Sequence, residues 1–159
     1  MCSREDNVLD LIEISASGSP AEDMVELPEV ATEVGVAYVG LYDSVGFVRP
    51  WVGFLAREDS ACIGTCGFKG PPQNNRVEIA YFTFPGYEGR GYATQMARAL
   101  IDKALGARAD TIVAAQTLPQ ESASTAILRK LGFALIGSIN HPEDGEVWEW
   151  RLHNHAGSV

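Results

Sequence analysis

The sequence predicts a single mixed α/β domain: a mostly antiparallel sheet with one parallel strand pair, flanked by helices. Three observations support this fold class. A chain of 159 residues fits one domain with a sizeable core, and we take 1–159 as that domain. The hydrophobic period changes from two to 3.6 after residue 84, where a run of strands gives way to a helix. A strand, a helix and a second strand then follow in order, and a crossover of that length implies a right-handed parallel pair.

The first half of the chain reads as strands around one stretch that is hard to interpret. Val8–Ile14 is predicted as the first strand. Gly18-Ser19-Pro20 suggests a helix start, and residues 21–33 are predicted to form one or two short helices. A hairpin follows, with strands at Trp51–Ala56 and Ala61–Phe68 and a turn at 57–60, and then a strand at Arg76–Phe84.

The second half has sharper patterns. A helix at 91–105 is predicted from its apolar stripe, and Gly106 is expected to close it as the C′ residue. The stripe consists of Ala93, Met96, Ala97, Leu100, Ile101, Ala104 and Leu105. Asp110–Gln116 is then a buried strand. A helix at 122–131 follows, with Ala123, Ala126, Ile127 and Leu131 on its apolar face and Gly132 at its end. Phe133–Ile139 and Glu146–Leu152 read as a final hairpin.

Composition narrows the class of partner. A net charge of −9 makes nucleic acid and anionic membranes poor partners, and it mildly favours a cationic substrate such as an amine. The first residues carry acids early and lack the apolar stretch of a secretory signal, so a cytoplasmic location is expected. The chain has three cysteines, Cys2, Cys62 and Cys66, and an odd number argues against a disulfide framework and favours reduced thiols. No histidine lies near them in the sequence, so a metal site is not expected.

A glycine-rich loop at 86–94 (Gly-Tyr-Glu-Gly-Arg-Gly-Tyr-Ala-Thr) lies between the strand at 76–84 and the helix at 91–105. A helix start presents unpaired N–H groups and the positive end of a dipole, which suit a phosphate. On the glycines alone, a plain turn is an equally good interpretation. The loop lacks the Gly-Lys-Ser/Thr ending of a P-loop, and it follows antiparallel strands rather than opening a dinucleotide-binding βαβ unit.

The segment Glu88-Gly89-Arg90-Gly91-Tyr92-Ala93 resembles the Gln/Arg-x-x-Gly-x-Gly/Ala pyrophosphate loop of the GNAT acetyltransferase superfamily, with Glu88 departing from the usual Gln or Arg. Residues 117–124 and 127–133 resemble the family's later motif, in particular that of enzymes that acetylate the N-termini of ribosomal proteins. Ser122 stands where that branch commonly has Asn. The resemblance covers about residues 50–152.

The resemblance implies acetyl-coenzyme A as co-substrate, without a metal. The cofactor-binding residues that it implies are Tyr81, Phe82, Thr83, Glu88, Gly89, Arg90, Gly91, Tyr92, Ala93, Thr94 and Ser122. The backbone of residues 81–83 is expected to line the pantetheine arm in a splayed gap between two parallel strands. The implied reaction is direct attack by a primary amine, either a peptide N-terminus or a small amine. A module that binds acetyl-coenzyme A without turnover is the alternative, and a nucleotide-binding enzyme is a third. A homodimer is the assembly expected from the family.

Three residues are candidates for proton transfer. Glu78 is the first choice of base, because it is an acid inside an apolar strand leading into the site; a solvated carboxylate is the competing interpretation. Glu143 is a second candidate by resemblance, although Pro-Glu-Asp-Gly is also an ordinary turn. The resemblance places Leu128 where many family members have a tyrosine that acts as acid. It implies that Ser124 takes this role, and the competing interpretation is a plain residue of the first helical turn.

Overall fold

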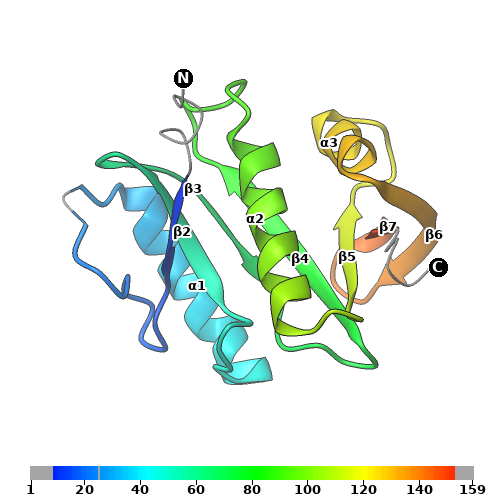
Figure 1. Ribbon diagram of the computed structural model, residues 1–159, viewed down its shortest axis with the longest axis horizontal. Helices are drawn as coiled ribbons and strands as arrows, with labels where there is room; N and C mark the ends of the chain where they lie inside the picture. The colour runs from blue at the N-terminus through cyan, green and yellow to red at the C-terminus, as the bar shows by residue number, and fades with distance from the viewer. Residues whose placement is uncertain (1–8, 25, 153–159) are drawn as a thin grey trace.

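The computed structural model describes residues 9–24 and 26–152, and Figure 1 shows their arrangement. Ten elements follow one another along the chain: β1 (Asp10–Glu13), α1 (Glu29–Val45), β2 (Gly53–Glu58), β3 (Ala61–Phe68), β4 (Arg76–Thr83), α2 (Tyr92–Ala107), β5 (Ile112–Thr117), α3 (Ala123–Leu131), β6 (Phe133–His141) and β7 (Gly145–Leu152). The strands form one sheet in the order β1-β2-β3-β4-β5-β7-β6. Its one parallel pair is β4 with β5, and the other five pairs are antiparallel. The predicted fold class is confirmed.

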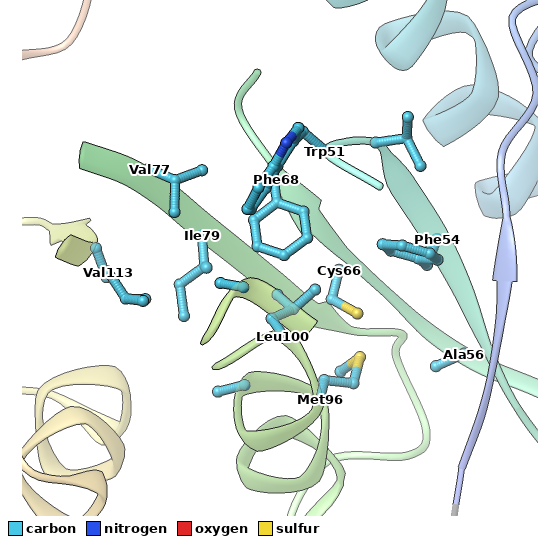
Figure 2. Packing of buried hydrophobic residues seen from close by; sticks show 14 of the residues in the cluster. Trp51, Phe54, Ala56, Cys66, Phe68, Val77, Ile79, Met96, Leu100 and Val113 are labelled. Atoms are coloured by element: carbon cyan, nitrogen blue, oxygen red, sulfur yellow. The ribbon is translucent and has the colours of Figure 1, made fainter. Parts of the chain in front are cut away.

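Helix α2 packs on one face of the sheet, and α1 packs on the other. Met96, Leu100 and their α2 neighbours are fully buried against side chains of β2, β3, β4 and β5, including Phe54, Cys66 and Ile79 (Figure 2). Leu55, which follows Phe54 in β2, points the opposite way and packs with Ala31 of α1 in a second cluster. This alternation follows from the two-residue period of a strand, and it buries both faces of β2 and β3.

The predicted short helices at 21–33 are wrong: one longer helix, α1, begins at Glu29 and runs to Val45. Gly18-Ser19-Pro20 forms a turn closed by hydrogen bonds between Ser15 and Ser19 and between Gly18 and Ser15, not a helix start. The turn lies directly against α1, because a side chain on Gly35 would collide with the Gly18 carbonyl. Packing therefore explains a glycine inside α1, which the sequence pattern alone makes look like an interruption.

Two further details of the predicted helices are corrected. Helix α2 continues through Gly106 to Ala107, and the N–H of the extended residue Arg108 closes it on the Ala104 carbonyl. On α3 the buried residues are Thr125 and Leu128, whereas Ala123 and Ala126 are exposed. Thr125 can be buried without an unsatisfied hydroxyl, because this hydroxyl completes the capping box that starts the helix. Gly132 ends α3, as predicted, and adopts the left-handed conformation there.

Strand bounds and the cysteines follow the predictions closely. β3 has the predicted bounds, β4 ends one residue earlier, and β2 is shifted by two residues toward the C-terminus. Of the predicted first strand, Asp10–Glu13 forms β1 and Ile14 makes a bridge to Pro20, while Val8 lies outside the described residues. Cys62 and Cys66 are buried free thiols on β3, and Cys2 lies outside the described part.

The parallel pair opens toward the C-terminal ends of its strands. β4 and β5 are in register at Arg76–Ile112, Val77–Val113 and Glu78–Ala114, where the pairing stops although both strands continue. The splayed gap expected between the two parallel strands is therefore present. Helices α2 and α3 begin on one side of this opening, so the fold places the glycine-rich loop and the start of α3 beside it.

Candidate functional site

A groove of about 390 Å³ lies between the end of β4, the glycine-rich loop and the first turns of α2 and α3. Its volume falls within the range of small-molecule sites. The structure brings nine predicted cofactor residues together along its wall: Tyr81, Phe82, Thr83, Glu88, Gly89, Gly91, Tyr92, Ala93 and Thr94. Ser124 and the apolar residues Ala123 and Ile127 complete the lining from α3. The α3 residues predicted to face the core therefore in part face this groove.

The backbone of the loop is shaped to leave room for a ligand. Gly89 and Gly91 have φ angles of 80° and 84°, in the left-handed region that glycine adopts without strain. A Cβ built on either residue meets no atom within 4 Å, so the space above the backbone is open. Gly91 is also the N-cap of α2 and makes no side-chain cap hydrogen bond. The first N–H groups of this 16-residue helix are thus free to donate hydrogen bonds to an anion at the positive end of the helix.

The charged residues of the loop turn away from this space or lie beside it. Glu88, the departure from the family pattern, accepts a hydrogen bond from the Gly86 N–H through Oε1 at 2.9 Å, which folds its carboxylate back onto the loop. Arg90 stacks over the Tyr87 ring at 5.6 Å and is not among the groove-lining residues. The side chain of Tyr92 is buried, with its hydroxyl bonded to Glu58 of β2.

Ser122 and Ser124 have different surroundings. Ser122 caps α3: its Oγ accepts from the Thr125 N–H at 3.4 Å, and its own N–H donates to Thr125 Oγ1 at 2.9 Å. It does not line the groove, so the structure gives Ser122 a local structural role and does not place it with the other predicted cofactor residues. Ser124 lies in the first turn of the same helix and lines both the groove and a second cavity.

This second cavity, of about 110 Å³, lies where the β4–β5 pairing stops. It shares Tyr81 and Ser124 with the groove, so the two spaces meet at these side chains. Glu78 lines it, with its side chain 13% exposed, and forms ion pairs with Lys69 Nζ at 3.3 Å and Arg76 Nη2 at 3.4 Å. A carboxylate is thus held at the opening of the parallel pair, and Lys69 stands beside it on the cavity wall.

A buried charge network contacts Glu78 through Arg76, and it was not predicted from the sequence. Glu149 of β7 is 1% exposed and accepts hydrogen bonds from Arg76, Gln116 and Arg151. Burial alone would raise the pKa of Glu149, but these hydrogen bonds outweigh it and lower the pKa below its usual value. The available signal was an acid between Trp148 and Trp150 in an apolar strand.

Tyr81 carries a second feature that sequence reasoning missed, because only its backbone was considered. Its hydroxyl is buried and makes no hydrogen bond within the described residues. Burial raises the pKa of Tyr81 to about 12, so the hydroxyl stays protonated at neutral pH. Buried polar groups normally have a partner. A buried donor without one, on the wall shared by both spaces, is a place where a ligand acceptor would fit.

The remaining predicted residues lie elsewhere. Glu143 is exposed in the turn between β6 and β7, where its N–H donates to His141 Nδ1, and it lines neither the groove nor the second cavity. Leu128 is fully buried beside the second cavity, so the position where many family members have a tyrosine offers no hydroxyl. Within residues 9–24 and 26–152, no group of three or more His, Cys, Asp or Glu is arranged to hold a metal. No helix in those same ranges has the length and apolarity to cross a membrane.

Comparison with known proteins places this geometry in context. The family model described as an acetyltransferase (GNAT) domain matches residues 26–134. A curated relative, an uncharacterized N-acetyltransferase p20 from Bacillus licheniformis, is 30% identical over 90 residues, 56% of this chain. The match spans about half, 51%, of that relative's length.

Solved structures share the fold. The putative acetyltransferase yncA from Salmonella typhimurium, solved with its cofactor acetyl-CoA, superposes with a TM-score of 0.57 at 20% identity, covering 77% of this chain and 73% of that one. The ribosomal-protein α-N-acetyltransferase RimL superposes with a TM-score of 0.64 at 16% identity, covering 92% and 94%.

Proposed function

The chain belongs to the GNAT acetyltransferase family, and from this premise we propose that it transfers the acetyl group of acetyl-CoA to a primary amine by direct attack. The observation that carries the proposal is the junction of two spaces at Tyr81 and Ser124: a groove under an open glycine loop, and a cavity that holds a carboxylate. Such an arrangement supplies a place for a phosphate-bearing acyl donor on one side and a base for an amine on the other.

The residues of the loop fit the pyrophosphate of the cofactor. The open space above Gly89 and Gly91 and the uncapped start of α2 suit a phosphate that approaches the backbone closely. Glu88 is compatible with this role because its carboxylate is already bonded to Gly86. The residues at 81–83 and the start of α3 would hold the pantetheine arm. Acetyl-CoA supplies the acetyl group as a thioester, already activated for attack.

Glu78 is proposed to take the proton that the acceptor ammonium must lose, because nitrogen attacks only with a free lone pair. Its position on the cavity wall and its low exposure support this role. Tyr81 is proposed to donate a hydrogen bond to the thioester or its leaving sulfur, because its hydroxyl is protonated and buried and has no partner in the described part of the chain. Ser124 is the alternative donor, since it lines the same junction.

The acceptor class is a primary amine, either a small molecule or a peptide N-terminus, and we propose a cytoplasmic location and a homodimer. Two buried free thiols are consistent with a reducing compartment. The chain is acidic overall, and solved structures with the same fold include a spermidine N-acetyltransferase chimera and a ribosomal-protein α-N-acetyltransferase, so both kinds of amine stay within the proposal.

Calorimetric titration with acetyl-CoA tests the proposal, with NAD and ATP as controls. Micromolar binding of acetyl-CoA alone is expected, followed by release of free coenzyme A thiol in the presence of a suitable amine. Binding without turnover across a broad amine panel would instead support a non-catalytic acetyl-CoA-binding module. Binding of NAD or ATP in place of acetyl-CoA would refute the proposal.

A further inference from the structure

We propose that the acceptor is a zwitterion, with a carboxylate next to the reacting amine, as in a free amino acid. This inference rests on the proposed function and adds a substrate class to it. The observation behind it is the charge on the wall of the cavity at the β4–β5 opening. Its lining includes two charged side chains, one anion and one cation: Glu78 and Lys69.

The two charges are adjacent, and a hydrogen bond joins the backbones of the two residues. Lys69 Nζ lies 3.3 Å from Glu78 Oε2, and the Lys69 N–H donates to the Glu78 carbonyl at 2.9 Å. The Lys69 side chain is 47% exposed, whereas Glu78 is 13% exposed. The cation is therefore the more solvent-accessible member of the pair.

The two arginines near the Glu78–Lys69 pair are bonded to another carboxylate. Arg76 contacts Glu78, but its guanidinium also makes a two-point hydrogen bond with buried Glu149. Arg151 bonds to the same carboxylate. Among the described residues, the ion pair that Lys69 makes is with Glu78. Lys69 is thus the cation that loses its partner when Glu78 turns to an incoming ammonium.

A zwitterion can replace both partners of the Glu78–Lys69 ion pair, so neither side chain is left without an opposite charge. Its ammonium takes the place of Lys69 beside Glu78, and its carboxylate takes the place of Glu78 beside Lys69. A polyamine would instead bring like charge against Lys69, and a peptide N-terminus would offer only an amide oxygen. Charge-assisted hydrogen bonds to a carboxylate are stronger than those to a neutral oxygen, so the free acid is preferred.

The size of the cavity agrees with a small head group. Its volume of about 110 Å³ is well below the volume of about 390 Å³ of the groove. An amine, a Cα atom and a carboxylate make up a head group of few atoms, which suits the smaller of the two spaces. Ser124 on the wall adds a hydroxyl that can hydrogen-bond to the same head group.

The overall charge of −9 attracts cations to the protein as a whole, but most of these charges are too far from the cavity to select its ligand. Exposed charges separated by more than about 8 Å are largely screened at physiological ionic strength. The lysine on the cavity wall therefore decides which acceptor is held for reaction.

The test compares matched acceptors. The common amino acids are assayed as free acids, as carboxamides and as the corresponding decarboxylated amines, with coenzyme A thiol release as readout. The free acid of the preferred side chain is expected to show kcat/KM at least about 10-fold above its amide and amine. Lys69→Gln should raise KM for the free acid about 10-fold and leave that for the amide within two-fold, and Lys69→Glu should favour the amine. Lys130→Gln removes an exposed cation from α3 and should change neither ratio.

Calorimetry on the same preparations separates the two failures. If acetyl-CoA does not bind, the proposed function fails. If acetyl-CoA binds but the amide or amine is used as well as the acid, the inference alone fails. An unchanged acid-to-amide ratio in Lys69→Gln also overturns it. If no acceptor reacts, the free amino acids and their amides are titrated into protein saturated with coenzyme A. Binding of the free acid but not of the amide, and loss of that binding in Lys69→Gln, supports the inference. Absence of binding by the free acids overturns it.

Discussion

Arg76 of β4 holds Glu149 of β7 across the intervening strand β5, with Nε 2.9 Å from Oε2 and Nη2 2.8 Å from Oε1. The same guanidinium contacts Glu78. One side chain therefore connects a buried structural acid to the acid proposed as catalytic base, and it joins the two sides of the β4–β5 opening.

Replacing Arg76 tests the structural side of this connection. Arg76→Met leaves Glu149 buried with only Gln116 and Arg151, and breaking a buried ion pair from one side typically costs about 3–5 kcal/mol. Because two donors remain, we expect the free energy of unfolding in urea to fall by about 2–3 kcal/mol. Arg49→Met, which removes a largely exposed ion pair with Glu13, should cost less than about 1 kcal/mol. Equal effects of the two changes would contradict the assignment.

Glu149 should make stability depend on pH in the acid range. Its folded pKa is lowered, so its contribution is fully present above the unfolded value of about 4.3 and is lost as pH falls through the folded pKa. Glu149→Gln should destabilise the protein by about 1–3 kcal/mol at pH 7. The difference between wild type and variant, measured by urea unfolding from pH 7 down to pH 3, should shrink as pH falls below about 4. A difference that stays constant would show that the charge of Glu149 contributes nothing.

Gly91 and Gly106 form a matched pair of glycines at the two ends of α2. Gly91→Ala places a Cβ at a φ of 84° and in the open space of the groove, so stability should fall by about 1 kcal/mol and acetyl-CoA affinity by at least about 10-fold. Gly106→Ala is helical and faces open space, so stability should rise by about 0.5–1 kcal/mol. Calorimetry should find its acetyl-CoA affinity unchanged. Retained affinity in Gly91→Ala and Gly91→Glu would refute the phosphate role of the loop.

Tyr81 and Tyr42 allow the same chemical change to be compared in two settings. Tyr81→Phe removes a hydroxyl that has no hydrogen-bond partner among residues 9–24 and 26–152. Thermal stability should therefore stay the same or rise, while turnover should fall about 10-fold. Tyr42→Phe removes a hydroxyl that donates to the Ile14 carbonyl and accepts from the Gly53 N–H. It should lower stability by about 1–3 kcal/mol without changing kcat. Full turnover in Tyr81→Phe would move the donor role to Ser124.

Glu78 and Glu143 are the two candidate bases. Glu78→Gln should lower kcat about 100-fold while acetyl-CoA affinity is retained, because a general base contributes about 10²–10⁴ to the rate. Glu143→Gln changes an exposed turn residue that lines neither space, and we expect kcat within two-fold of wild type. The reverse result in steady-state assays would assign the base to the β6–β7 turn.

The parts of the fold predicted correctly are those with a local signal. The apolar stripe of α2 and the left-handed glycine after α3 each leave a pattern within a few residues. Helix α1 leaves a weaker one, because apolar residues occur on its exposed side as well, including Val36, which is 70% exposed. Its Gly35 is explained by contact with Gly18, which is distant in sequence.

The same distinction separates the groove from the second cavity. The glycine loop lies within one stretch of sequence, so its residues were found together. Glu149 lies 73 residues from Arg76, and only the sheet order brings them into contact. Within the described residues, the Tyr81 hydroxyl has no hydrogen-bond partner because none of the residues packed around it supplies one. The sequence of β4 alone does not contain this information.

The short register between β4 and β5 divides the sheet mechanically. With three paired positions at the junction, β1–β4 and β5–β7–β6 form two plates joined by a narrow strip, and the Arg76–Glu149 hydrogen bonds cross this strip. Bending should concentrate at this strip, and amide hydrogen exchange should distinguish the plates from the junction. A molecule that fills the opening would brace it as well, so its binding should slow exchange on both sides of the junction together.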